Sequence, residues 1–196
     1  MFSVVFPGQG SQEVGMGKIF YERYDLVKNY FKDADESLNF PISKLILEGP
    51  KSDLDLTFNT QPAIFLISYS IFNVIKKEFN IDLNKANFFA GHSLGEYTAL
   101  SCAGYIKFSD TLKILKLRGE AMQNSVPEGI GGMIAILATT IKKVESIISS
   151  NKNCNVQIAN DNSEGQIVVS GKLKDLDTLT EILKSQGIRN IKLPVS

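Results

Sequence analysis

The sequence of 196 residues is 43% hydrophobic and 21% charged, which is enough apolar material for the core of one globular domain, or of one domain with a small insertion. Lysine plus arginine equals aspartate plus glutamate at 21 each, so the net charge gives no general attraction to nucleic acid or to an anionic membrane. The two cysteines, Cys102 and Cys154, have no metal-binding or redox spacing, and they suit a reducing compartment.

The first residues run directly into a strand-like segment at 2–6, with no basic or apolar leader before it, which favours a cytoplasmic protein. The nearly uncharged run 63–75 is too short and too polar to cross a bilayer. It is predicted to be a buried helix, with Thr60 as its N-terminal cap and Pro62 in its first turn.

A glycine-rich loop, Pro7-Gly8-Gln9-Gly10-Ser11-Gln12, follows the first strand. Its spacing fits neither a dinucleotide-binding motif, which needs glycine where Glu13 stands, nor a phosphate-binding P-loop. The loop can still turn its backbone amides toward a ligand at the carboxyl end of the strand, and Gln9 is the candidate donor. A plain connecting turn is the alternative interpretation.

The pentapeptide Gly91-His92-Ser93-Leu94-Gly95 has the G-x-S-x-G form of a nucleophile elbow. An apolar run at 88–90 precedes it and a helix-forming stretch at 96–103 follows it, so a strand is expected to reverse sharply into a helix there. Such a turn would hold Ser93 in a strained conformation with its hydroxyl exposed, and the Leu94 amide would face the oxyanion of an acyl intermediate. The alternative is a tight turn with a helix-capping serine.

A helix is predicted over 110–124, with Ser109 as its cap. Leu115, Arg118 and Met122 recur at spacings of three and four and therefore share one face, whereas the lysines of this helix point elsewhere. A guanidinium on an apolar face requires a carboxylate or a phosphate. Arg118 is therefore a candidate ligand for an anionic substrate, or else half of a structural salt bridge.

The composition changes at 127–132, and a second unit is predicted beyond this break. Its segments read β-α-β-β-α-β, the ferredoxin-like order. The predicted strands are 133–138, 155–159, 166–170 and 188–193, and the predicted helices are 141–149 and 173–185.

Four stretches in order resemble the malonyl-CoA:acyl-carrier-protein transacylase family: Phe6 to Gln12, Gly91 to Tyr97, Arg118-Gly119, and Leu193-Pro194-Val195-Ser196. The resemblance runs the whole length of the sequence and implies an α/β protein. It implies an incomplete α/β-hydrolase-like large subdomain at 1–126, and a ferredoxin-like small subdomain at 127–196 inserted into it.

The resemblance also implies a role for each candidate residue. Ser93 would accept a malonyl group from malonyl-CoA and pass it to the phosphopantetheine thiol of acyl carrier protein, in fatty acid biosynthesis. Gln9 and Leu94 would supply the oxyanion amides, and Arg118 and Met122 would bind the substrate. No metal or cofactor beyond the two substrates is implied, and neither a nucleic acid nor a membrane is an expected partner. The sequence does not determine the oligomeric state, and a monomer is expected.

In the family that the sequence resembles, the general-base histidine lies beyond the Leu-Pro-Val-Ser segment. The one histidine of the sequence, His92, is adjacent to Ser93 and is not expected to reach its hydroxyl, because neighbouring side chains at a strand end point apart. The sequence is therefore predicted to be part of a longer protein. A serine hydrolase such as a thioesterase, and a catalytically incomplete module that binds acyl carrier protein, are the alternative functions.

Overall fold

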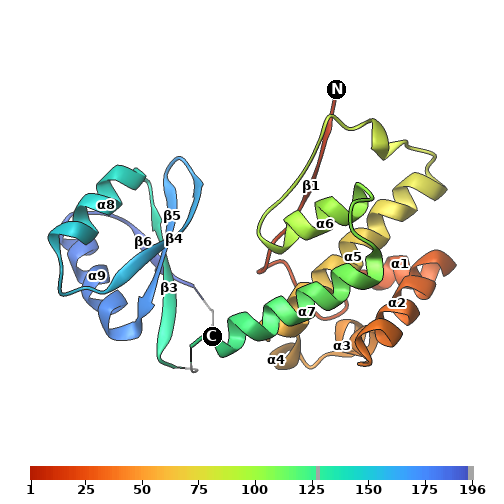
Figure 1. Ribbon diagram of the computed structural model, residues 1–196, viewed down its shortest axis with the longest axis horizontal. Helices are drawn as coiled ribbons and strands as arrows, with labels where there is room; N and C mark the ends of the chain where they lie inside the picture. Colours follow the sequence, from red (N-terminus) through yellow and green to blue (C-terminus); the bar gives the residue numbers. More distant parts are fainter. Residues whose placement is uncertain (127–128, 194–196) are drawn as a thin grey trace. The chain divides into compact units, whose positions relative to one another are not determined.

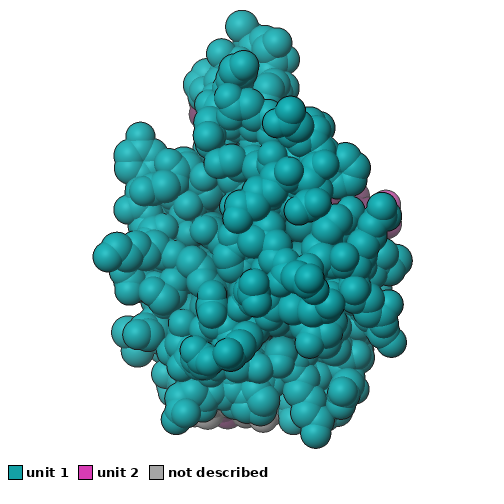
Figure 2. All heavy atoms as spheres, turned by 90° about the vertical axis from the view of Figure 1, so that its right-hand side faces the viewer, with its two compact units in different colours: residues 1–124 teal, residues 125–196 magenta. Residues whose placement is uncertain are grey.

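The computed structural model describes residues 1–126 and 129–193. They form two compact units, Met1–Asn124 and Ser125 onward, which are described separately below (Figure 1). Figure 2 shows one face of the first unit, in teal. Parts of two sequence features, the break that begins at Pro127-Glu128 and the Leu193-Pro194-Val195-Ser196 stretch, lie outside the described residues. The mixed α/β class predicted from the sequence is confirmed.

The first unit consists mainly of helices that pack around one large apolar core (Figure 1). Its helices are α1 Lys18–Arg23, α2 Asp25–Leu38, α3 Ile42–Glu48, α4 Lys51–Leu54, α5 Thr57–Glu78, α6 Leu94–Cys102 and α7 Phe108–Asn124, with a short 3-10 turn at Leu83–Lys85. No helix in the described parts of the chain is long and apolar enough to cross a membrane.

Two parallel strands, β1 Ser3–Phe6 and β2 Phe88–Gly91, form the sheet of the first unit, with Phe6 opposite Gly91. Their inward side chains pack with α5 and α6 in a second, smaller core. Because the strands are parallel, their carboxyl ends lie at the same edge of the sheet. The loop after β1 and the turn after β2 are therefore neighbours, and the Phe6 carbonyl accepts a hydrogen bond from the His92 amide at 3.2 Å.

Helix α5 begins earlier than the sequence analysis predicted. It starts at Thr57, so Pro62 lies inside the helix, and the expected capping role of Thr60 is wrong. The Thr60 hydroxyl instead donates to the Leu54 carbonyl at 2.6 Å, and the Asn59 amide donates to the Asp53 carbonyl at 2.9 Å. These bonds fix the extra turn ahead of Pro62. The proline lacks a backbone N–H, so the helix loses one hydrogen bond there but does not end.

Helix α7 packs closely along α5. It begins at Phe108, so Ser109 lies within the helix, and its predicted capping role is also wrong. Gly119 allows the close packing, because a Cβ atom there would lie 2.8 Å from the Phe58 nitrogen and 2.8 Å from the Thr57 carbonyl oxygen. This contact brings the start of α5 against the middle of α7.

The second unit has the predicted β-α-β-β-α-β order (Figure 1). All neighbouring strands in its sheet are antiparallel, in the order β4-β5-β3-β6, and the two helices bury their apolar residues with the sheet in one core. The elements are β3 Gly131–Leu137, α8 Ile141–Ser150, β4 Val156–Ser163, β5 Gln166–Lys172, α9 Leu173–Ser185 and β6 Asn190–Lys192.

Strand β4 is longer than predicted, because its polar half, 160–163, continues to pair with β5 through two register shifts. Gly165, with φ +91°, occupies the tight turn that joins the two strands. Pairing in this hairpin, rather than an apolar pattern, therefore defines the end of the strand.

Candidate active site

Ser93 lies in the sharp turn between β2 and α6, with φ 55° and ψ −109°. A positive φ is strained for serine, so the conformation predicted from the G-x-S-x-G pattern is confirmed. The two glycines are needed for space. A Cβ at Gly91 would overlap the backbone carbonyl group of Gly95, and a Cβ at Gly95 would lie 2.6 Å from the Phe6 carbonyl oxygen. The turn therefore tolerates no side chain at either position.

The Ser93 hydroxyl lies beside the guanidinium of Arg118. Arg118 Nη2 donates to Ser93 Oγ at 3.0 Å, and Nη1 donates to the Gln61 side-chain oxygen at 2.7 Å. The guanidinium carbon also lies 5.7 Å from the centre of the Tyr97 ring on α6. Residues from α5, α6 and α7 thus hold the arginine at the serine.

The partners of Arg118 within the first unit are neutral. Among residues 1–124, all of which the structure describes, no carboxylate lies within ion-pair distance of the guanidinium. A guanidinium that binds an amide oxygen and a hydroxyl keeps its full positive charge. The chemistry of this position therefore suits an anionic group next to the Ser93 oxygen.

The loop after β1 lies beside the same turn. The Gln9 side chain donates to the Thr57 hydroxyl at 3.4 Å, and the Gln12 side chain donates to Asp55 at 2.9 Å, so the loop is tied to the start of α5. Leu94 is the first residue of α6, where amides have no partner within the helix. The two amide donors predicted from the sequence thus belong to two segments that meet at one edge of the sheet.

The predicted apolar face of α7 is only partly buried. Leu115 is fully buried, whereas the Met122 residue is 46% exposed, so the face that carries Arg118 is buried at one end only. The helix ends two residues after Met122. The Met122 sulfur nevertheless accepts a hydrogen bond from the Gln61 side-chain amide at 3.3 Å. Because Gln61 also binds Arg118, this bond places the sulfur near the guanidinium.

The sequence analysis missed two contributions of α5. Gln61 is fully buried and contacts both Arg118 and Met122. Asn59 accepts a hydrogen bond from Lys116 Nζ at 3.2 Å. The same nitrogen lies 4.2 Å from the centre of the Phe58 ring. Burial lowers the pKa of Lys116. The sequence did carry a signal for both residues. Asn59 and Gln61 stand at the start of an apolar run, and a side-chain amide that is buried there needs hydrogen-bond partners.

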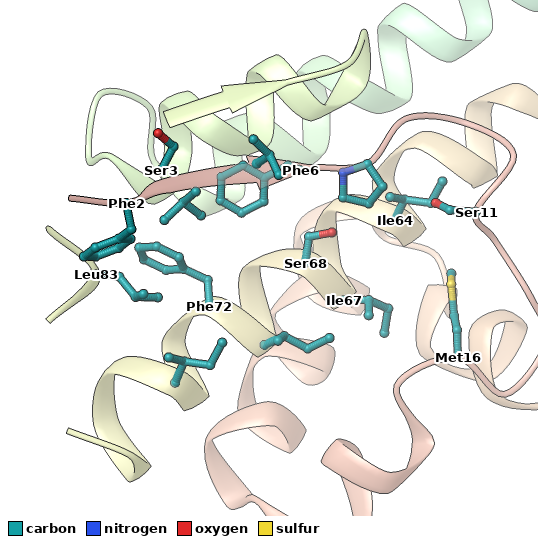
Figure 3. A pocket seen from close by; sticks show the side chains of 15 residues that line it. Phe2, Ser3, Phe6, Ser11, Met16, Ile64, Ile67, Ser68, Phe72 and Leu83 are labelled. Carbon is teal, nitrogen blue, oxygen red and sulfur yellow. The ribbon is translucent and has the colours of Figure 1, made fainter. Parts of the chain in front are cut away.

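Two other features of the first unit are the thiol of Cys102 and a pocket beside β1. Cys102, at the end of α6, is buried, and burial raises the pKa of its thiol to about 12. A mainly apolar pocket of about 500 Å³ lies between β1 and α5, lined by Phe2, Phe6 and Phe72 among others (Figure 3). Neither Ser93 nor Arg118 lines it. The chemistry of the unit is thus centred on the elbow rather than on this pocket.

The described residues thus place a strained serine between a strand and a helix, with an arginine that has no carboxylate partner within residues 1–124 on its oxygen. The model of the acyl transferase domain family matches residues 3–195, so the chain belongs to that family. It is 44% identical over 196 residues to the malonyl CoA-acyl carrier protein transacylase of Bacillus subtilis (strain 168), with 98% of this chain and 60% of that protein covered.

Two solved structures are similar over the whole chain. An acyl-carrier-protein-S-malonyltransferase from Bartonella henselae has a TM-score of 0.92 and 40% identity, with 100% of this chain and 63% of that chain covered. A malonyl-transacylase in complex with a type II PKS acyl-carrier protein has a TM-score of 0.89 and 35% identity, with 100% and 63% covered. The chain therefore spans between 60% and 63% of the length of these three proteins.

Proposed function

We propose that the protein containing this chain transfers a malonyl group from malonyl-CoA to the phosphopantetheine thiol of acyl carrier protein, in cytoplasmic fatty acid biosynthesis. The observation that carries the proposal is the hydrogen bond from Arg118 to Ser93. It puts a cation that has no carboxylate partner within residues 1–124 beside the Ser93 oxygen, where the free carboxylate of a malonyl thioester would lie. The relatives named above support the same reaction.

In the proposed reaction the Ser93 oxygen attacks the thioester carbonyl carbon. The carbon–sulfur bond breaks, and the serine proton passes through a base to the departing coenzyme A thiol. The carrier-protein thiol then attacks the malonyl ester and the Ser93 hydroxyl is restored. Both steps pass through an oxyanion, for which the amides of Gln9 and Leu94 are the proposed donors. Such donors typically contribute about 3 to 4 kcal/mol each to transition-state stabilisation.

Arg118 is proposed to receive the malonyl carboxylate through parallel hydrogen bonds, and Met122 to pack against the acyl group. A charge-assisted pair of this kind favours malonyl over acetyl, which has no carboxylate to offer. A hydrolase of neutral acyl groups has no use for a cation on its serine, so the thioesterase alternative is less well supported.

The proposed architecture is an α/β-hydrolase-like subdomain at 1–126 with a ferredoxin-like subdomain at 127–196. The strand–elbow–helix of the first unit and the antiparallel sheet order of the second support this assignment. We assign the general base to the part of the full-length protein that this chain does not span. His92 is not the proposed base, although its imidazole lies against Gly8 in the loop after β1.

The test is mass spectrometry of the full-length protein after incubation with malonyl-CoA. We expect one malonyl group on the peptide containing Ser93, its loss when holo-acyl carrier protein is added, and no labelling of Ser93→Ala. Malonyl found on a cysteine, or an ester that carrier protein does not discharge, would refute the proposal.

A further inference from the structure

Gln61 lies where it can orient the substrate-binding arginine without touching substrate itself. It is fully buried, and its oxygen accepts from Arg118 Nη1 at 2.7 Å while its nitrogen donates to the Met122 sulfur at 3.3 Å. The direction of the amide is fixed by chemistry, because a guanidinium has donors only and a thioether sulfur is an acceptor. Both polar ends of the side chain therefore have a partner.

A glutamate in place of Gln61 would have the same shape, and the two side chains would differ in charge. A glutamate would orient Arg118 equally well and would neutralise it, since carboxylate and guanidinium form a strong bidentate pair. A glutamine holds the guanidinium and leaves its charge available. The absence of any carboxylate partner for Arg118 within residues 1–124 shows that no other side chain of this unit removes that charge.

We propose that Gln61 is a positioning residue that sets acyl selectivity by being an uncharged acceptor for Arg118. It holds one nitrogen of the guanidinium, and the remaining donors face Ser93 and an acyl group that carries a carboxylate. This inference rests on the proposed malonyl transfer and adds a specificity determinant to the same site.

The experiment compares Gln61→Glu and Gln61→Met in the full-length protein, with malonyl-CoA and acetyl-CoA as donors. In Gln61→Glu the introduced carboxylate competes with the malonyl carboxylate, so the malonyl-to-acetyl ratio of kcat/KM should fall by about 10²-fold. Gln61→Met removes the acceptor and adds no charge. It should raise KM for malonyl-CoA by roughly 10-fold and change acetyl transfer little.

The pH dependence separates charge from packing. In Gln61→Glu, protonation of the introduced carboxyl group as the pH falls makes it a neutral isostere of glutamine, so the malonyl-to-acetyl ratio should recover toward that of the unmodified protein. Dividing this ratio by the same ratio for the unmodified protein at each pH removes the pH dependence of the serine and its base, which both donors share, and that of the malonyl carboxylate itself. A change due only to disturbed packing would not follow pH in this way.

The chain offers a matched control in Asn59, another buried amide on the same turn of α5, which accepts from Lys116 instead of Arg118. Asn59→Asp makes the same amide-to-carboxylate change two residues away and also removes the bond to the Asp53 carbonyl; where the variant is folded, it should leave the malonyl-to-acetyl ratio unchanged. Thermal unfolding of every variant identifies any loss of activity that comes from loss of the fold.

Two outcomes overturn the inference. One is an unchanged malonyl-to-acetyl ratio in folded Gln61→Glu, and the other is an equal shift in Asn59→Asp. If Gln61→Glu does not fold, an unchanged KM for malonyl-CoA in Gln61→Met overturns it. Failure of the unmodified protein to form a malonyl ester on Ser93 would instead refute the proposed function, so the two failures are distinguishable.

Discussion

The close contact between α5 and α7 predicts that Gly119→Ala disturbs both stability and substrate selection. A new Cβ would lie 2.8 Å from the Phe58 nitrogen and from the Thr57 carbonyl oxygen, with the Phe58 Cα closer still. Ordinary van der Waals contact begins at 3.4 Å, so these atoms must separate by at least 0.6 Å (3.4 − 2.8). The obstructing atoms are backbone, so the adjustment requires movement of one helix against the other.

The magnitude follows from two opposing effects. Overpacking of a tight core costs about 1 to 3 kcal/mol, and contact with rigid backbone places this site at the upper end. Alanine gains about 1 kcal/mol over glycine in a helix interior, so the net loss of unfolding free energy should be about 2 kcal/mol. The same movement separates Gln61 from Arg118, and malonyl transfer should fall by roughly 10-fold or more, since small misplacements are costly in catalysis.

The assay is thermal unfolding together with malonyl transfer by the full-length protein. Ala121→Gly is the control, because it measures the propensity effect alone at an exposed position of the same helix. If Gly119→Ala raised the melting temperature by the amount that Ala121→Gly lowers it, no steric cost would exist, and the close packing of α5 on α7 would be refuted.

The other predictions concern single side chains. Arg118→Ala should reduce malonyl transfer by about 10²-fold or more and spare acetyl transfer, as measured by kcat/KM for both donors; equal losses would favour a purely structural arginine. Ser93→Ala should abolish ester formation, whereas Cys102→Ala should not, as read by intact mass. Burial raises the pKa of Cys102 from 9.0 to about 12, so the contribution of its protonated thiol to the free energy of unfolding should be complete below pH 9 and disappear as the pH rises toward 12. Urea titrations of the unmodified protein and of Cys102→Ala measure it, and a difference in unfolding free energy that stays constant with pH would contradict this.

The elements that the sequence predicted well are those encoded by neighbouring residues. The G-x-S-x-G pattern specifies a strand, a turn and a helix within a dozen positions, because two glycines and a strained serine fit few other backbones. The order of segments in the second unit likewise follows from local changes in apolar periodicity. Helix α9, predicted at 173–185, has those limits in the structure.

The misplaced helix starts have a different origin. Thr60, Pro62 and Ser109 are all residues that favour a helix N-terminus, but here each lies inside a helix. The turn of α5 before Pro62 is held by side-chain bonds from Asn59 and Thr60 to carbonyls of the preceding segment. Such bonds depend on how the chain folds back on itself, and a propensity for capping does not reveal them.

The site could be predicted only in part for the same reason. Ser93 and Arg118 each stand out in their own segment, but their contact joins residues 25 positions apart, and Gln61 lies 57 positions from Arg118. Nothing near Gln61 in the sequence identifies its partner. The structure supplies the link by packing the first turn of α5 against Gly119 of α7.

The two cations of α7 show why partners matter more than helical face. Lys116 has one nitrogen, and it lies over the Phe58 ring, near Asn59 and 4.0 Å from the Glu120 carboxylate. Arg118 has five N–H donors in a planar fork, so it can hold Gln61 and still present donors toward Ser93. A lysine held in the same way would have little capacity left for a carboxylate. We therefore attribute the choice of arginine over lysine at position 118 to the neutral acceptor on α5 rather than to the charge pattern of α7.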